Sequence, residues 1–442
     1  MKHEKFHYHS LNEVKEELKK LGVELPLSED LSVLSASLEI QGRSVPNRLA
    51  IQPMEGCDGT ADGKPDELTL RRYRRFAESG AGLIWEEATA IVPEGRANPR
   101  QLWIHKENLD SYKSFVEGIK SDCMKKNGVE PLVIMQATHS GRYSKPNGVP
   151  EPWIAYHNPI FEKDHPISDD RIISDERLRE LEEIYGQAAG LAEQAGFDGV
   201  DIKCCHRYLL SELMSAYERK GNYGGSFENR SRLFLQAVRD AKENTSSNFI
   251  VTSRMNIYDG FPWPNGFGVE QGQGTKPSLE EAVRLVRILH HELGVQLLDF
   301  TIGNPYFNPH VNRPYDNGGY VPDEHPLEGV ARMFDCIREV SSHFPELKVI
   351  SSGHSYLRQF SPYLAAGAVS QGISSMAGFG REAFAYPQFA GDLLKTGKID
   401  ERKCCITCGK CTELMRAGSV AGCVIRDSGV YGPIYQRDVM KK

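Results

Sequence analysis

The sequence has little that would indicate a membrane, secreted or nucleic-acid-binding protein. In its 442 residues no apolar run approaches the ~18 residues that a membrane span requires. The polar segment 1–10 has no apolar stretch of the secretory type, and no Lys/Arg-rich run occurs. A formal net charge of -7 also argues against nucleic acid as the main partner. With 26% charged and 40% hydrophobic residues, the composition is that of an ordinary cytoplasmic enzyme.

Cysteine, by contrast, is concentrated near the C-terminus. Five of the ten cysteines lie between residues 404 and 423. Without a visible signal peptide, such clustering indicates metal or redox use more than disulfides. Cys405, Cys408 and Cys411 have the spacing C-x2-C-x2-C, which is used for [4Fe–4S] ligation. Four cysteines can also form a closed zinc site, which is the alternative, and free thiols are a third reading.

Short apolar runs alternate with helical patterns from residue 47 onward. Eight such strands over about 330 residues predict an α/β TIM barrel, with a doubly wound sheet as the runner-up. Before them, the apolar spacing of Leu11–Leu21 predicts an amphipathic helix in a leader that serves as a cap or an oligomer arm. The predicted strands are Arg48–Gln52, Gly82–Glu86, Leu132–Gln136, Gly199–Lys203, Phe249–Arg254, Gln296–Thr301, Lys348–Ser352 and Gly372–Met376.

Polar residues follow these strands where core packing does not need them. After the fourth strand, Lys203, His206 and Tyr208 occur within six residues. The C-terminal ends of parallel strands meet at one mouth, so the three donors are expected to converge there as an active site. The bland reading of any single one is an ordinary surface residue at a strand end.

Glycine-rich turns follow the seventh and eighth strands. They carry Gly353-His354 and Gly380-Arg381, and backbone N–H groups at such turns can cradle a phosphate. Long loops rich in Pro and Gly span residues 139–173, 255–277 and 303–326. Loops of this length in a compact domain are usually functional, so we expect lids over the mouth.

The strand ends together resemble the Old Yellow Enzyme family of FMN-dependent reductases. The similarity covers roughly residues 45–395 and involves all eight strand ends in family order. The matching pieces are NRLAIQPM, GLIWEEATAI, QATHSGR, AGFDGVDIKCCHRYLL, NYGGSFENRSR, TSRM, SSGH and GFGREAFAYP.

This resemblance implies a role for each matching position. Gln136 would bind the flavin pyrimidine edge, and Arg254 would stabilise the anionic reduced ring. His206, with Lys203 as its partner, would bind the carbonyl oxygen of the substrate, and Tyr208 would donate a proton to its α-carbon. The remaining implied flavin contacts are Pro53, Met54, Glu55 and Ala88 along the ring, and Gly353, His354, Gly380 and Arg381 at the phosphate.

The sequence departs from the family pattern in this stretch. The common His-Gly-Ala-His-Gly-Tyr is replaced by Lys203-Cys204-Cys205-His206-Arg207-Tyr208. Lysine keeps a donor and adds a point charge unless burial lowers its pKa, which suits an oxyanion or a carboxylate-bearing substrate. We interpret the two cysteines as packing residues rather than a redox pair. Glu55 stands where the family often has Thr or Cys.

The C-terminal cysteines resemble those of the 2,4-dienoyl-CoA reductase branch. That branch carries a four-cysteine cluster after the barrel, which implies Cys405, Cys408, Cys411 and Cys423 as the ligands, with Cys404 as an alternative to Cys405. We therefore expect a leader over 1–44, an FMN-binding barrel over 45–395 and an iron–sulfur segment over 396–442.

No G-x-G-x-x-G follows a predicted strand. Electrons are therefore expected either from a separate protein through the cluster or from NAD(P)H directly.

Three functions remain open at this point. The first is an ene-reductase that saturates an electrophilic alkene conjugated to a carbonyl. The second is an amine dehydrogenase or demethylase of the trimethylamine dehydrogenase type, which a cationic Lys203 and Arg207 would disfavour. The third is a non-catalytic electron-transfer subunit. A homo-oligomer is compatible with all three.

Overall fold

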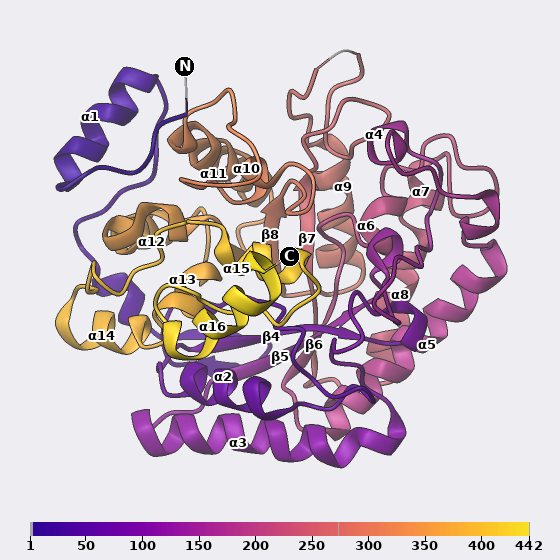
Figure 1. The fold of residues 1–442 in the computed structure, drawn as a ribbon, viewed down its shortest axis with the longest axis horizontal. Coiled ribbons are helices and arrows are strands. Elements are labelled where there is room, and N and C mark those ends of the chain that lie inside the picture. The colour runs from indigo at the N-terminus through magenta and orange to yellow at the C-terminus, as the bar shows by residue number, and fades with distance from the viewer. Residues whose placement is uncertain (1–2, 273, 442) are drawn as a thin grey trace.

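Eight parallel strands close into a barrel in the computed structural model, which describes residues 3–272 and 274–441 (Figure 1). The last strand pairs with both the seventh and the first, so the sheet has no free edge. The predicted TIM barrel is thus confirmed and the doubly wound alternative is excluded. In chain order the strands are Leu49–Ile51 (β3), Leu83–Ala90 (β4), Leu132–Thr138 (β5), Gly199–Ile202 (β6), Ile250–Tyr258 (β7), Leu297–Ile302 (β8), Lys348–Ser351 (β9) and Met376–Phe379 (β10).

Most strands lie within one or two residues of their predicted bounds, and three differ more. The eighth begins at Met376 rather than Gly372, because Gly372 adopts a left-handed conformation (φ 68°) in the turn before it. The fifth continues past Arg254 to Tyr258. The second continues to Ala90 through a bulge that follows Trp85. Polar residues in these strands, which resembled strand ends in the sequence, are buried extensions of the barrel.

Helices surround the barrel and carry the connections between strands (Figure 1). They occupy the connections in which the sequence alternates apolar runs with helical patterns, and their apolar faces pack toward the barrel. The helices are Leu11–Leu21 (α1), Glu67–Ala77 (α2), Leu109–Asn127 (α3), Pro159–Glu162 (α4), Asp175–Gln194 (α5), Leu209–Leu213 (α6), Phe227–Arg230 (α7), Arg232–Glu243 (α8), Glu280–Arg287 (α9), Pro309–Asn312 (α10), Pro326–Ser342 (α11), Ser361–Ser370 (α12), Arg381–Ala385 (α13), Phe389–Thr396 (α14), Lys410–Arg416 (α15) and Ser428–Tyr435 (α16).

The N-terminal leader folds back on the barrel. Its helix α1 has the predicted bounds, begins at the N-cap Ser10 and ends at Gly22 in a left-handed conformation. Before the helix, Phe6 packs against Tyr356 and donates a backbone hydrogen bond to Asp316. A hairpin that the sequence analysis did not identify, Leu38–Ile40 (β1) with Arg43–Val45 (β2), connects the leader to the barrel. The leader is therefore a cap on its own barrel.

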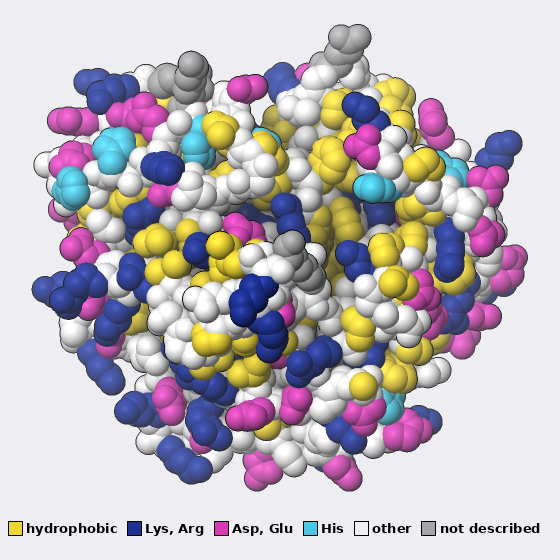
Figure 2. Space-filling model, in the orientation of Figure 1, with side chains coloured by type: hydrophobic (Ala, Val, Ile, Leu, Met, Phe, Trp, Pro, Cys, Tyr) yellow, Lys and Arg dark blue, Asp and Glu magenta, His cyan; other side chains and the backbone are white. Residues whose placement is uncertain are grey.

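The C-terminal segment lies over the mouth of the barrel at which the strands end. Figure 1 shows α15 and α16 crossing in front of the strands. Asp427 accepts two hydrogen bonds from Arg71 (2.7 and 2.9 Å) and one from Arg75 (2.5 Å), both on α2. These ion pairs hold the cysteine-rich segment against the barrel. In the space-filling view, Lys and Arg side chains gather near the middle of this face (Figure 2).

Candidate active site

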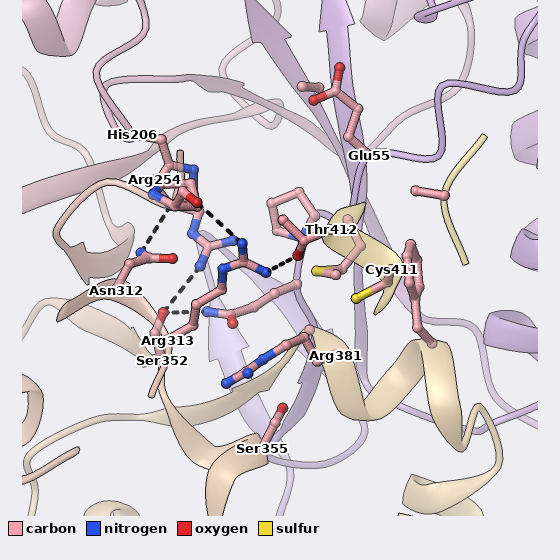
Figure 3. A pocket seen from close by; sticks show the side chains of 18 of the residues that line it. Glu55, His206, Arg254, Asn312, Arg313, Ser352, Ser355, Arg381, Cys411 and Thr412 are labelled. Atoms are coloured by element: carbon pink, nitrogen blue, oxygen red, sulfur yellow. Dashed lines mark hydrogen bonds between the residues drawn. The ribbon is translucent and has the colours of Figure 1, made fainter. Parts of the chain in front are cut away.

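A pocket of about 1000 Å³ opens at the C-terminal mouth of the barrel. It brings together residues from most strand ends and from the C-terminal segment (Figure 3). Eleven of the thirteen residues predicted for catalysis or flavin binding line it: Lys203, His206, Pro53, Met54, Glu55, Ala88, Gln136, Arg254, Gly353, Gly380 and Arg381. Tyr208 and His354 are buried beside it.

The floor of the pocket is a network of buried polar side chains. Gln136 lies opposite Ala88 across β4 and β5, because the bulge in β4 resets the register. Its amide donates to Asp201 (2.6 Å), and the backbone N–H of Arg254 donates to the same carboxyl (2.8 Å). The Arg254 Nε lies 3.4 Å from Asp299. Burial raises the pKa of Asp201 to about 7 and that of Asp299 to about 6.

Two glycines at one end of the pocket stand where the surroundings leave no room for a side chain. Gly353 has φ 94°, and a Cβ there would meet Met333 Sδ at 2.9 Å. A Cβ on Gly380 would meet Met54 Sδ at the same distance. Arg381 and Ser355 lie beside these turns at one end of the pocket (Figure 3). Small residues, free backbone and a guanidinium are the chemistry that a phosphate requires.

The side chain of His354 does not line the pocket, and the contact expected between this turn and the FMN phosphate stays a prediction. The His354 ring is buried, stacks on Phe379 and bonds Ser351 Oγ at 2.9 Å. Burial lowers its pKa to about 3, so the ring is a neutral core residue. Any phosphate contact at this position would come from its backbone, while Ser355 supplies the side-chain hydroxyl on the wall.

His206 is held as a neutral hydrogen-bond donor. It has φ 62°, a left-handed conformation that is unusual for a side chain with a Cβ and typical of functional sites. Asn312 donates to Ile302 O (2.7 Å), which fixes its amide, and the same nitrogen faces His206 Nε2 at 3.3 Å. We therefore assign the ring proton to Nδ1. Burial, together with Arg254 and Lys203, lowers the pKa of His206 well below its ordinary value.

Lys203 and Tyr208 form a contacting pair. The Lys203 ammonium lies 3.7 Å from the centre of the Tyr208 ring, and burial lowers the lysine pKa. The Tyr208 hydroxyl donates to Glu55 Oε2 (3.1 Å). It is also hydrogen-bonded to the Tyr306 hydroxyl (2.6 Å), and either oxygen can be the donor of that bond. Tyr208 thus reaches the pocket through two residues that line it.

Three of the departures from the family pattern, Cys204, Cys205 and Arg207, do not line the pocket. Cys204 and Cys205 are buried, and burial raises the pKa of both thiols, to about 12 for Cys205. Arg207 is fully buried with φ 60° and pairs with Asp259 at 3.1 Å. The prediction that Arg207 would repel a cationic substrate is therefore wrong, because its charge is neutralised outside the pocket.

The cysteine-rich segment forms a second cavity of about 390 Å³ that adjoins the first. Cys405, Cys408, Cys411 and Cys423 all line it, and Cys411 also lines the main pocket. Cys404, the remaining cysteine of this segment, is buried, with its Sγ 3.4 Å from Asp400 O. Within the described residues, no three of these thiols lie within 4.8 Å of one another.

Several pocket residues were not identified from the sequence. Tyr306, Asn312 and Arg313 come from the long loop 303–326, whose composition suggested a lid but not which side chains point inward. Thr412 accepts from Arg313 (2.5 Å) at the boundary with the cysteine segment (Figure 3). Asp201 carried a signal, since a carboxylate inside a buried strand requires partners.

A closed parallel barrel with a polar pocket at its C-terminal mouth defines the class of fold. The sequence profile of the NADH:flavin oxidoreductase / NADH oxidase family matches residues 36–293. The chain therefore belongs to this oxidoreductase family, which confirms the resemblance drawn from the strand ends.

Individual relatives extend the similarity over most of the chain. An NADH oxidase from Thermoanaerobacter brockii is 26% identical over 412 residues, covering 90% of this chain and 56% of its own. A 2-naphthoyl-CoA reductase in complex with 2-naphthoyl-CoA superimposes with a TM-score of 0.73 at 18% identity, over 89% of this chain and 57% of its own. Histamine dehydrogenase from Rhizobium sp. 4-9 gives 0.67 at 21% identity, over 90% and 52%. The chain thus spans little more than half of these relatives.

Proposed function

We propose that the protein is an FMN-dependent ene-reductase that saturates a C=C bond conjugated to a carbonyl. The observation that carries this is the convergence of a neutral His206 on one pocket with Gln136 and Arg254. The Tyr208 hydroxyl lies behind the wall and bonds two residues that line it, Glu55 and Tyr306. When bound, FMN supplies the hydride for the β-carbon. Gln136 and Arg254 would hold its ring, and the Gly353 and Gly380 turns its phosphate.

His206 and Lys203 would bind the carbonyl oxygen of the substrate. Negative charge develops on this oxygen during hydride addition, and donors aimed at it in advance lower the barrier. Nδ1 of His206, the ring nitrogen that does not face Asn312, carries the proton and can donate it. Lys203 adds a second donor on the same wall. Tyr208 would supply the proton for the α-carbon as a general acid, through the Tyr306 hydroxyl that lines the pocket.

The second cavity would hold a [4Fe–4S] cluster on Cys405, Cys408, Cys411 and Cys423. A single zinc ion at ~2.3 Å from each sulfur would place the thiolates ~3.8 Å apart. The four thiols line one cavity, and among the described residues no three of their sulfur atoms lie within 4.8 Å of one another. This wider spacing supports a cluster of several metal ions over one zinc ion. Such a cluster transfers single electrons.

Contact of Cys411 with the main pocket supports electron entry to the flavin from this side. A separate electron-donor protein is our preferred source, with NAD(P)H as the second.

The pocket charge favours a substrate with anionic or strongly electron-withdrawing groups. Lys203, Arg254, Arg313 and Arg381 line it against one carboxylate, that of Glu55. Glu55 is also the specific observation in favour of the second candidate, oxidation of an amine, since a carboxylate can bind a cation. Rapid bleaching of the oxidised flavin by an amine would establish that alternative.

The substitution Tyr208→Phe tests the proton-donor role. We expect reduction of an enone to slow by on the order of 10²-fold, while FMN content and the rate of flavin reduction stay unchanged. Tyr185→Phe is a matched control, because the Tyr185 hydroxyl on α5 is buried without a hydrogen-bond partner. Native turnover in Tyr208→Phe would show that the proton comes from elsewhere.

A further inference from the structure

Glu55 is an unusual residue for this pocket. Within the described part of the chain, it is the single acidic side chain on the wall, and it stands where the family often has Thr or Cys. Its Oε2 accepts from Tyr208, while its Oε1 is buried without a hydrogen-bond partner. A buried carboxylate oxygen with no donor is costly, whereas a protonated carboxyl can satisfy the site with its own O–H.

The two tyrosines extend Glu55 into a chain of three exchangeable protons. The Tyr208 hydroxyl lies 3.1 Å from Glu55 Oε2 and 2.6 Å from the Tyr306 hydroxyl. Because Tyr208 has one hydroxyl proton, it donates to one neighbour and accepts from the other. When Glu55 is ionised, Tyr208 donates to it and Tyr306 donates to Tyr208. When Glu55 is protonated, both hydrogen bonds reverse: Glu55 donates to Tyr208, and Tyr208 donates to Tyr306. The Tyr306 hydroxyl can then donate into the pocket that it lines.

Tyr306 is held in place for this role. Its backbone N–H donates to Asn304 Oδ1 (2.9 Å), and its carbonyl accepts from the Arg416 side chain (3.1 Å). Its ring packs on that of Tyr143, with centroids 4.3 Å apart. Because its backbone and its ring are both held, the Tyr306 side chain loses little freedom when its hydroxyl donates to a bound substrate.

We propose that Glu55 in its acid form is the proton reservoir of the active site, passing its proton through Tyr208 to Tyr306, which delivers it to the substrate. This inference rests on the proposed ene-reduction. Per turnover the alkene gains one hydride at the β-carbon, from the reduced flavin, and one proton at the α-carbon, from Tyr306. Tyr306 is reprotonated by Tyr208, Tyr208 by Glu55, and Glu55 by solvent. The C=C π bond breaks and two C–H bonds form.

The charged groups around Glu55 are compatible with this role. Burial raises its pKa, and the facing Lys203, Tyr208 and Cys57 lower it in part. Tyr306 faces the same carboxyl, and burial next to Glu55 raises the tyrosine pKa well above its ordinary value. The acid form of Glu55 is thus retained to a higher pH than that of an exposed glutamate.

The test is Glu55→Gln, which keeps the shape and the hydrogen bond to Tyr208 but cannot transfer a proton. Anaerobically reduced protein is mixed with cyclohexenone, and flavin reoxidation is followed from pH 5 to 10. In the wild type we expect the rate to fall as pH rises through the pKa of Glu55. In Glu55→Gln we expect a rate lower by on the order of 10²-fold, with that pH limb absent. Tyr306→Phe should slow reoxidation similarly while retaining the Glu55 carboxyl.

Infrared difference spectra provide a readout independent of turnover. We expect the wild type minus Glu55→Gln spectrum to contain a protonated-carboxyl band at neutral pH. Glu86→Gln is the matched control, because burial also raises the pKa of Glu86, which lies away from the pocket wall. It should lose a band of its own and keep the pH limb. An unchanged rate and pH profile in Glu55→Gln would overturn the reservoir, whereas no reoxidation of the wild type by any enone would instead refute the proposed function.

Discussion

Replacing Arg207 should loosen the loops over the active site by a predictable amount. This arginine is fully buried and pairs with Asp259, which is also fully buried, at 3.1 Å. It also donates to Tyr156 (3.1 Å) and packs against Phe161, with the guanidinium carbon 5.1 Å from the ring centre. It therefore joins the loop after β5 to the loop after β7. Phe307, from the loop after β8, packs on Phe161 as well, with centroids 5.0 Å apart.

The magnitude follows from the pair and from the backbone. Removing one partner of a buried ion pair costs about 3–5 kcal/mol. Asp259 would keep hydrogen bonds from Asn256 (2.7 Å) and from the Phe267 N–H (3.1 Å), so Arg207→Ala should cost about 3 kcal/mol, the lower end. Arg207→Gly should cost about 0.5–1 kcal/mol less, because relief of the left-handed backbone, about 1–2 kcal/mol, exceeds the entropy cost of glycine.

Urea unfolding of the two variants measures both quantities, and limited proteolysis of residues 139–173 and 255–277 measures the loosening of the loops. The double variant Arg207→Ala/Asp259→Ala should lose less stability than the sum of the single variants. If Arg207→Ala remained within 1 kcal/mol of the wild type, or the loops stayed resistant to protease, the anchoring role of this pair would be refuted.

Three further predictions concern other parts of the molecule. Arg72→Met, which leaves the buried carboxylates of Asp58 and Glu87 without their cation, should lower the free energy of unfolding by about 3–5 kcal/mol in urea titrations. His354 has a folded pKa of about 3, so the unfolded state binds more protons between pH 6.5 and 3. The free energy of unfolding should therefore decrease as the pH is lowered through that window, by about 1.4 kcal/mol per pH unit from this residue. His354→Gln should remove that slope. Cys405→Ser should abolish bound iron, whereas Cys404→Ser, at a buried thiol that points to Asp400, should retain it in iron analysis.

Much of the fold was predictable because periodicity is a local property. Strand β5, for example, is buried along its whole length and begins as an apolar run, and α1 has the bounds that its apolar spacing gives. Strand ends were less predictable. The bulge after Trp85 and the extension of β7 beyond Arg254 bury polar residues that local patterns assign to a loop.

The site was predictable where residues follow strands and unpredictable where loops fold over them. Lys203, His206, Gln136 and Arg254 meet because the mouth of a parallel barrel brings its strand ends together. Tyr306 reaches the same pocket from a long loop, and no local rule fixes the direction of its side chain. Neither the burial of His354 nor the outward pairing of Arg207 follows from a one-dimensional motif, since both depend on tertiary contacts.

The central claim, reduction of an electrophilic alkene at a flavin in this pocket, is tested most directly by anaerobic half-reactions of the purified protein. We predict that the protein contains flavin and iron, that the chemically reduced form is reoxidised by an enone to give the saturated ketone, and that amines leave the oxidised form unchanged. A protein without flavin, or one that is bleached by an amine and inert toward every enone, would contradict it.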